Sequence, residues 1–183
     1  MKNYEKSIAV SGTHGKTTTT SMLTEILMDE KKNPTISVGG MLDSIGGNIR
    51  VGGPELFVTE ACEYTNSFLS FFPNMEIILN IEADHLDFFK DIEDIRHSFR
   101  EFAELLPENG ILIINSDIHD YKEICDGLPI KVITVGSDPA KSHYSAADVT
   151  FNENACATYT LLEDGKAIDT ITLGVPGIHN VYN

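Results

Sequence analysis

The stretch that decides the fold is Ser11-Gly12-Thr13-His14-Gly15-Lys16-Thr17-Thr18-Thr19-Thr20, which directly follows the apolar run Ile8-Ala9-Val10. An apolar strand, a glycine-rich turn and then a helix form the setting that a phosphate-binding loop requires. The two glycines let the backbone approach a polyphosphate closely, and the N–H groups that open the helix favour an anion there. Lys16 can reach the β and γ oxygens, and the Thr17 hydroxyl is placed to ligate magnesium.

The match to the general phosphate-loop pattern is incomplete. That pattern carries a further glycine six residues before its lysine, and here Val10 stands at that position. The alternative interpretation is an ordinary strand-to-helix turn with a solvated lysine. The buried type of the preceding strand, the four threonines that follow and a later acidic cluster favour a phosphate loop.

Composition limits the function classes. The chain has 183 residues, enough for one domain with a sizeable core. A net charge of −15 argues against nucleic acid as a partner, because binding a phosphate backbone needs a broad basic surface. No apolar run approaches the roughly 18 residues of a membrane helix, so we expect no membrane insertion. The three cysteines form no CxxC pair, which suits reduced thiols in a cytoplasmic protein.

The order of elements predicts an α/β fold. Apolar periodicity indicates helices at about 16–29 and 91–106 and a short helix between 115 and 131. The runs that we expect to be strands are 8–10, 35–38, 56–59, 75–81, 111–115 and 131–135. This alternation predicts a mostly parallel, doubly wound P-loop sheet flanked by helices over about 7–143. Segments 158–162 and 168–173, joined by Asp164-Gly165, predict a hairpin in a small antiparallel sheet over about 144–175. The glycine-rich passage 46–54 fits either a surface loop or a small hairpin.

Polar clusters follow two of the predicted parallel strands, at Glu60-Ala61-Cys62-Glu63 and at 80–87. Ligands of an open parallel sheet bind beyond the carboxyl ends of its strands, so these clusters and the phosphate loop predict a magnesium site, although each cluster alone fits solvated loop residues. We expect Glu60, which comes directly off a strand, to be the principal magnesium carboxylate. Glu63 lies farther into the loop, where we expect it to be less constrained and free to cap the turn before Ser67.

Among the histidines, His85 differs from three others in its surroundings. His85 stands within the second acidic cluster, where it fits either a hydrogen-bonding loop residue or, less expectedly, a ligand beside magnesium, which prefers oxygen. His97, His119 and His143 have no such neighbours and are expected at the surface.

Four motifs in order resemble those of the Mur ligase family. They are Gly12-Thr13-His14-Gly15-Lys16-Thr17-Thr18, Glu60-Ala61-Cys62-Glu63-Tyr64, Asn80-Ile81-Glu82-Ala83-Asp84-His85-Leu86-Asp87 and Pro176-Gly177-Ile178-His179-Asn180. The resemblance spans nearly the whole chain, and the family's shorter loop, Gly-Thr-x-Gly-Lys-Thr, accounts for the missing glycine. Within the family, the sequence is most similar to the branch that joins L-alanine to UDP-N-acetylmuramate in peptidoglycan synthesis.

The resemblance implies ATP and Mg2+ as ligands and an amide-forming ligase as the parent enzyme. Carried over by position, Lys16 contacts phosphate, Thr17 and Glu60 hold one magnesium, and His85 helps to hold a second. Lys16, Glu60 and His85 are then the catalytic residues. The implied nucleotide contacts are Gly12, Thr13, His14, Gly15, Lys16, Thr17 and Thr18, with Asn180 and Asn183 at the adenine.

Two departures qualify the resemblance. Some family members use a carbamylated lysine on the helix after the histidine, where this chain has only Arg96 and Arg100, as in the alanine-adding branch. The family also has three domains, and residues 1–183 resemble only the central ATP-binding one. We therefore expect an excised segment, inactive by itself, whose parent binds UDP-N-acetylmuramate and L-alanine through the two further domains.

Three other functions stay open on the sequence. One is a different phosphate-loop protein, such as a kinase or nucleotide switch, against which the shortened loop and the stretch Asn80–His85 argue. Another is a different Mur-type ligase. The third is a nucleotide-binding module without chemistry of its own.

Overall fold

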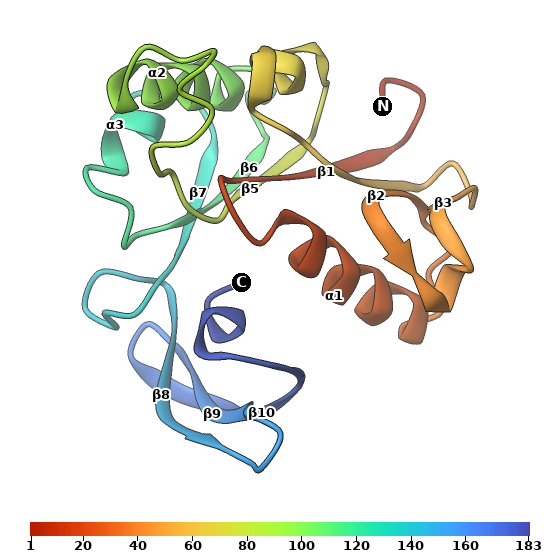
Figure 1. The fold of residues 1–183 in the computed structure, drawn as a ribbon, viewed down its shortest axis with the longest axis vertical. Coiled ribbons are helices and arrows are strands. Elements are labelled where there is room, and N and C mark those ends of the chain that lie inside the picture. Colours follow the sequence, from red (N-terminus) through yellow and green to blue (C-terminus); the bar gives the residue numbers. More distant parts are fainter.

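The computed structural model describes residues 1–183, and its frame is one ten-stranded sheet of order β10-β9-β8-β7-β6-β5-β1-β4-β2-β3 (Figure 1). The strands are β1 Lys6–Ser11, β2 Thr35–Leu42, β3 Gly47–Arg50, β4 Leu56–Glu60, β5 Met75–Ile78, β6 Ile111–Asn115, β7 Lys131–Val135, β8 Tyr144–Phe151, β9 Cys156–Glu163 and β10 Lys166–Pro176. The helices are α1 Lys16–Asp29, α2 Ile92–Ala103 and α3 Lys122–Cys125, with short 3-10 helices η1 Asp43–Ile45, η2 Tyr64–Ser70 and η3 Ile178–Val181. None of the helices is long and apolar enough to cross a membrane.

The centre of the sheet is parallel, as the alternation of strands and helices predicts. β1 pairs in parallel with β4 on one side, where Val10 lies opposite Glu60, and with β5 on the other, where Ser11 lies opposite Ile78. β6 and β7 continue the parallel pairing beyond β5. This register brings the carboxyl ends of β1, β4 and β5 together, so the loops that follow these three strands are neighbours.

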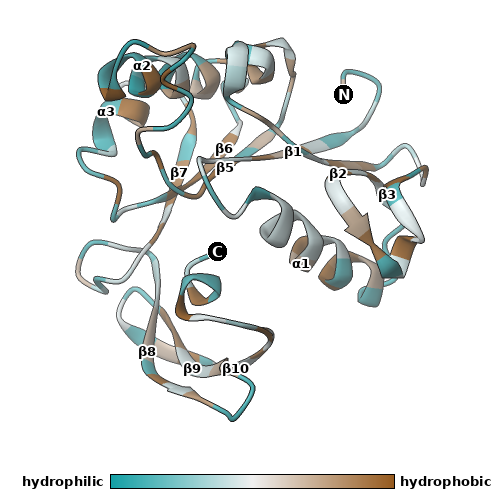
Figure 2. Cartoon of the chain, in the orientation of Figure 1, coloured by the Kyte–Doolittle hydropathy of each residue, from teal (hydrophilic) through white to brown (hydrophobic).

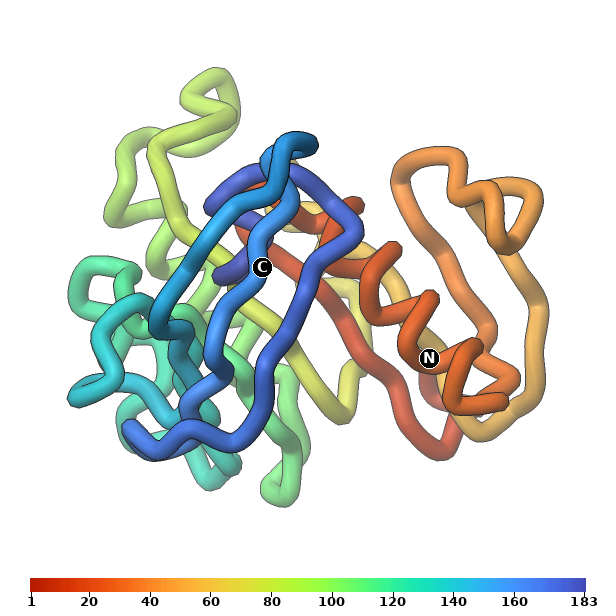
Figure 3. Tube along the Cα trace, turned by 90° about the horizontal axis from the view of Figure 1, so that it is seen from below, coloured from red at the N-terminus to blue at the C-terminus, as the bar shows by residue number.

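Helices cover both faces of the sheet. Figure 1 shows α1 on one side of the strands and α2 with α3 on the other. α1 packs on β1, β2 and β4, whereas α2 packs against α3 and η2. In both Figure 1 and Figure 3, α1 lies between the β2–β3 end of the sheet and strands β8–β10. The predicted doubly wound α/β fold is confirmed.

The main core lies under α2 and is aromatic at its centre. Phe68, Phe99 and Phe102 are fully buried in a cluster of 15 apolar residues, and the rings of Phe68 and Phe102 stack with centroids 4.4 Å apart. Figure 2 shows hydrophobic and hydrophilic residues alternating around α2, as expected for a helix with one face on a core. Asp91 caps this helix by accepting a hydrogen bond from the Asp94 N–H at 3.0 Å.

Two predicted elements are shorter in the structure. The strand expected over 75–81 ends at Ile78, because the chain leaves the ladder after Leu79, whose N–H still donates to the carbonyl of Ser11 at 3.1 Å. α2 ends at Ala103, although the buried Leu106 continues its apolar face into the following turn. Residue patterns thus located both elements but not their ends.

The antiparallel part is larger than the predicted hairpin. Three strands, β8, β9 and β10, pair in antiparallel fashion, and β8 joins the parallel sheet through the single pair Val135–Tyr144. These strands therefore extend the main sheet, where a separate sheet was expected. At the opposite edge, residues 47–50 of the glycine-rich passage form β3, which pairs with β2 in an antiparallel hairpin, whereas residues 51–54 form a loop.

Candidate nucleotide-binding site

The loop between β1 and α1 has the backbone shape that its two glycines predict. Gly12 has φ 135° and Gly15 has φ 85°, conformations that residues with a Cβ rarely adopt. A Cβ on Gly12 would lie 3.1 Å from the backbone nitrogen of Asn80. Gly15 occupies the N-cap position of α1, which has no side-chain cap. The first N–H groups of α1 therefore have no partner within the helix and are oriented to receive an anion.

Asn80 fixes the loop from outside. Its side-chain oxygen accepts from the His14 N–H at 2.7 Å, and its amide nitrogen donates to the His14 carbonyl at 3.0 Å. The Thr13 N–H donates to the Asn80 carbonyl at 3.2 Å, while the Thr13 hydroxyl accepts from the Glu82 N–H at 2.9 Å. Asn80 belongs to one of the four sequence motifs, but the motif by itself does not predict this role. An asparagine directly after the strand beside β1 was the available signal.

Lys16 curls back over the loop. Its ammonium nitrogen donates to the Gly12 carbonyl at 2.5 Å and lies 3.3 Å from the Thr13 carbonyl. The same nitrogen lies 3.0 Å from Oε2 of Glu63. The predicted phosphate contact is therefore inside the loop, where an anion bound to the N–H groups of the loop would meet it.

Thr17 and Glu60 lie together as predicted. The Thr17 hydroxyl donates to Oε2 of Glu60 at 3.1 Å, and Oε1 of Glu60 accepts from the Gly39 N–H at 2.7 Å. A Cβ on Gly39 would lie 2.8 Å from the carboxylate, so glycine allows β2 to approach this closely. A hydroxyl and a carboxylate side by side are oxygen donors of the kind that magnesium takes.

The expectation for Glu63 was wrong. Its side chain caps no turn, and the residue is only 2% exposed. The reason is the register of β1 with β4, which places the segment after β4 directly beside the phosphate loop and supplies Lys16 as a counter-ion. The acidic residue nearest the lysine is thus Glu63, whereas Glu60 contacts Thr17. Which carboxylate is the principal magnesium ligand stays a prediction.

His85 belongs to the group around Glu63. Its Nε2 lies 3.8 Å from Oε1 of Glu63, and its ring packs on Tyr64 with centroids 4.6 Å apart. The Tyr64 hydroxyl donates to Asp87 at 2.8 Å, and this bond to a carboxylate raises the pKa of Tyr64. Thr17 therefore contacts Glu60, and His85 lies beside Glu63. These two pairs do not contact each other directly and are connected only through Lys16 and the loop.

The remaining predicted site residues lie around the loop. Asn183 contacts it, since a Cβ on Gly15 would lie 2.7 Å from the Asn183 side-chain oxygen. Asn180 is buried and accepts from the Asn183 amide at 2.9 Å. The side chain of His14 is exposed, with Nε2 3.8 Å from Glu82, and Thr18 is half-buried in the first turn of α1. His97, His119 and His143 are exposed, as predicted.

Neither arginine of α2 faces this site. Arg96 is buried and donates to the carbonyls of His119 and Asp120 and to the Glu123 carboxylate. Arg100 donates to the Asp126 carbonyl at 2.8 Å. Both guanidinium groups therefore fasten α2 to the α3 region, a structural role.

The donor set fits a magnesium nucleotide. The loop offers backbone N–H groups and one ammonium, and two oxygen ligands stand at its end. No three His, Cys, Asp or Glu side chains gather closely enough to hold a metal by themselves. Magnesium does not need such a cluster, because it binds through one or two carboxylates together with phosphate oxygens and water.

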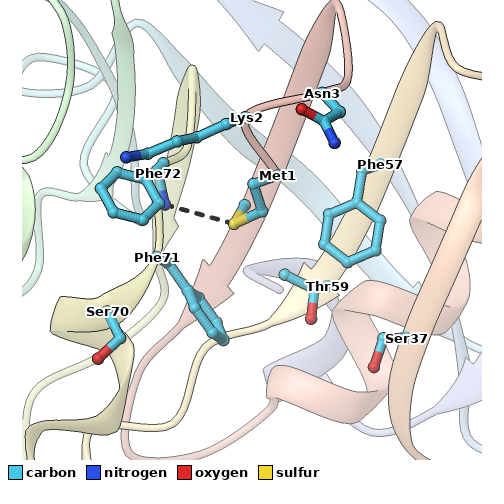
Figure 4. A pocket seen from close by; sticks show the side chains of 9 residues that line it. All are labelled: Met1, Lys2, Asn3, Ser37, Phe57, Thr59, Ser70, Phe71 and Phe72. Atoms are coloured by element: carbon cyan, nitrogen blue, oxygen red, sulfur yellow. Dashed lines mark hydrogen bonds between the residues drawn. The ribbon is translucent and has the colours of Figure 1, made fainter.

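Of two further hollows, one is lined by none of the predicted site residues and the other is lined by two of them. One, of about 580 Å3, is lined by the first residues of the chain, β2, β4 and the segment before β5. Figure 4 shows the rings of Phe57, Phe71 and Phe72 around it, with the Lys2 ammonium 3.8 Å from the centre of the Phe72 ring. The other, of about 410 Å3, lies between α1 and β9–β10 with mostly apolar walls, and Asn180 and Asn183 line it.

Comparison with known proteins agrees with these features. The family model described as the Mur ligase middle domain matches residues 10–183. A UDP-N-acetylmuramate–L-alanine ligase of Lachnospira eligens is 63% identical over 183 residues, which is all of this chain and 40% of that protein. The enzyme of the same name from Acetivibrio thermocellus is 50% identical over 183 residues, covering 39% of its length. The chain thus spans about 40% of the length of these curated relatives.

Solved structures show the same fold. The UDP-N-acetylmuramate–alanine ligase of Thermotoga maritima superposes with a TM-score of 0.82 at 29% identity, covering 99% of this chain and 40% of that one. A UDP-N-acetylmuramate:L-alanyl-γ-D-glutamyl-meso-diaminopimelate ligase of Neisseria superposes with a TM-score of 0.84 at 26% identity, covering 99% and 59%. The ten-stranded sheet is therefore an arrangement that these ligases share.

Proposed function

The chain belongs to the Mur ligase family as a middle domain, and we propose that residues 1–183 are the ATP- and magnesium-binding domain of a ligase that joins L-alanine to UDP-N-acetylmuramate. The observation that carries this proposal is the phosphate loop, with Lys16 inside it and Thr17 beside Glu60. The activity by which the relatives matching all of the chain are named supports the choice of L-alanine.

The reaction proposed for the whole enzyme is an ATP-driven amide synthesis. A carboxylate is a poor electrophile, since its charge repels an amine and its leaving group is oxide. Transfer of the γ-phosphoryl group to the carboxylate of UDP-N-acetylmuramate gives an acyl phosphate. The amine of L-alanine attacks that carbonyl, phosphate leaves, and the amide forms with loss of a proton from the amine.

This domain's share of the reaction is positioning and charge neutralisation. The N–H groups of the loop and of the first turn of α1 orient the phosphates, and Lys16 neutralises charge on the transferred group. Thr17 and Glu60 would hold the magnesium ion, which offsets charge on the phosphate oxygens when bound. His85, beside Glu63, would take part in a second metal site, and Asn180 and Asn183 would contact the adenine.

The test is ATP affinity of this chain in the presence of magnesium, measured by displacement of a fluorescent ATP analogue. Lys16→Met should weaken binding roughly 10- to 150-fold, the range for loss of a charged hydrogen bond. The double variant Lys16→Met/Glu63→Gln leaves no buried carboxylate unpaired and should bind equally weakly, which separates loss of the contact from misfolding.

The matched control is Lys31→Met, because Lys31 is exposed and distant in sequence from the loop. Its affinity should equal that of the wild type. ATP binding by Lys16→Met as tight as that of the control would refute the assignment of the loop. We expect this domain by itself to form no amide, since UDP-N-acetylmuramate and L-alanine would bind through further domains of the enzyme.

A further inference from the structure

We propose that Glu63 is a positioning residue that holds the Lys16 ammonium inside the phosphate loop and releases it to the phosphates when a nucleotide binds. The inference rests on the proposed nucleotide-binding function of the loop. Glu63 then sets the free-energy cost of nucleotide binding without itself contacting the phosphates.

Burial makes the contact between these two side chains strong. The Lys16 nitrogen lies 3.0 and 3.4 Å from the two oxygens of Glu63. The Glu63 side chain is 3% exposed and that of Lys16 is 16% exposed. A carboxylate in such a place requires a counter-charge, because an unpaired buried charge is costly. Glu63 therefore restricts Lys16 far more than a surface partner would.

The ammonium group has no hydrogen-bond donor to spare. It carries three N–H bonds, and its acceptors are the carbonyls of Gly12 and Thr13 and the carboxylate of Glu63. A phosphate oxygen can be reached only in exchange for one of them. The loop backbone is held by Asn80, so its carbonyls cannot withdraw freely. Glu63 is then the partner that the phosphate replaces.

A released Glu63 is not left without a neighbour. Its Oε1 faces Nε2 of His85 at 3.8 Å. The backbone of Glu63 is anchored, since its carbonyl accepts from the Asn66 N–H at 2.9 Å. The exchange thus requires only side-chain rotation, and the carboxylate moves from Lys16 toward the loop that carries His85.

Glu60 provides a matched control. It has the same charge and comes from the same segment, but it contacts Thr17 and the Gly39 N–H and makes no contact with Lys16. Removing either carboxylate reduces the negative charge near the phosphates. Only removal of Glu63 should free Lys16, so the two variants separate a specific contact from general electrostatics.

The first experiment measures acylation of individual lysines by an amine-reactive ester without nucleotide, followed by peptide mass spectrometry. In Glu63→Gln, Lys16 should react several times faster than in the wild type, while Lys31 and Lys166 keep their rates. Glu63→Asp should give an intermediate rate, because the shorter carboxylate restores part of the pairing. An unchanged Lys16 rate in a folded Glu63→Gln protein would refute the proposal. If that variant fails to fold, an unchanged rate in Glu63→Asp would do so.

The second experiment measures ATP affinity with chelator present, so that metal binding does not contribute. Glu63→Gln should tighten binding roughly tenfold, the lower end of what a charged hydrogen bond contributes, and Glu60→Gln should change it much less. Equal tightening in both variants, or weaker binding in Glu63→Gln, would overturn the exchange. If the wild type binds no ATP with or without magnesium, the nucleotide proposal fails, while the acylation rates still decide whether Glu63 holds Lys16.

Discussion

The two longer helices, α1 and α2, begin in opposite ways. α2 is capped by Asp91, and Asp94 in its first turn accepts from the Lys90 N–H at 3.0 Å, so side chains satisfy the start of this helix. α1 begins at Gly15 in the left-handed conformation, without any side-chain cap. The free N–H groups of α1 are available to a ligand, whereas those of α2 are used within the protein.

The buried faces of these two helices also differ. α2 buries Phe99 and Phe102 in the main core. α1 buries Thr19, Thr20 and Thr24, whose hydroxyls have no hydrogen-bond partner. A buried hydroxyl without a partner costs free energy, so these three residues stabilise the packing of α1 less than apolar side chains would. From this difference we infer that the α1 side of the sheet serves mainly ligand binding and the α2 side mainly stability.

The largest expected effect is on the α2 side. Phe102→Ala should lower the free energy of unfolding by about 3–5 kcal/mol, because it leaves a cavity where the ring stacks on Phe68. Urea denaturation followed by circular dichroism measures this. Phe151→Ala, in β8 where the residue is 49% exposed, is the control and should change stability little. If Phe102→Ala lowered the free energy of unfolding no more than the control does, the contrast between the α1 and α2 sides would be wrong.

The next effect concerns Glu76 of β5, which lies in the same core between Ala9 and Leu112 in the register. It is fully buried, neither oxygen has a partner, and burial raises its pKa well above the ordinary value of 4.5. The folded state therefore binds this proton more tightly than the unfolded state. Its contribution to stability is full below pH 4.5 and is lost as pH rises through the raised pKa.

Glu76→Met should remove that loss and stabilise the protein at pH 7 by about 1–3 kcal/mol, the cost of a buried polar group without a partner. Urea denaturation from pH 5.5 to 8.5 measures both effects. Glu76→Gln also cannot ionise, but it keeps buried polar atoms and should gain less. If the wild type and the Met variant depended on pH in the same way, the raised pKa would not be that of Glu76.

The smallest expected effect tests the helix starts directly. Asp91→Ala should cost about 1 kcal/mol of stability, as loss of an N-cap does, and leave ATP affinity unchanged. Asp91→Asn keeps a capping oxygen and should be nearly neutral. An Asn variant as unstable as the Ala variant would show that charge, and not the cap, matters. Weaker ATP binding in either variant would show that the two helices are not independent.

Part of the candidate site could be predicted from local sequence. Gly12, Gly15, Lys16 and Thr17 are consecutive or nearly so, and their roles follow from one turn between a strand and a helix. The loop glycines have positive φ values that residues with a Cβ rarely adopt, and Lys16 lies inside the loop. Thr17 lies beside Glu60 because β1, which leads into the loop and α1, pairs with β4, which ends at Glu60.

Glu63, for which the prediction was wrong, shows the limit of prediction from local sequence. Glu63 is predicted to be a less constrained residue because it lies farther into the loop than Glu60, and no local pattern indicates that it is buried. Its burial comes from Lys16, which is 47 positions away in the sequence. Likewise β8 was not predicted, since its pairing with β9 and its single link to β7 depend on how the sheet is extended.

The sequence by itself therefore determined the parallel α/β fold, the phosphate loop and the family, because each rests on short-range periodicity or on motifs with fixed internal spacing. The tertiary structure alone decided that Asn80 clamps His14 across 66 positions, that Glu63 pairs with Lys16, and that Asn183 lies against Gly15. The physical reason is strand register. Pairing β1 between β4 and β5 brings three distant loops to one edge, and no local pattern specifies which side chains then face one another.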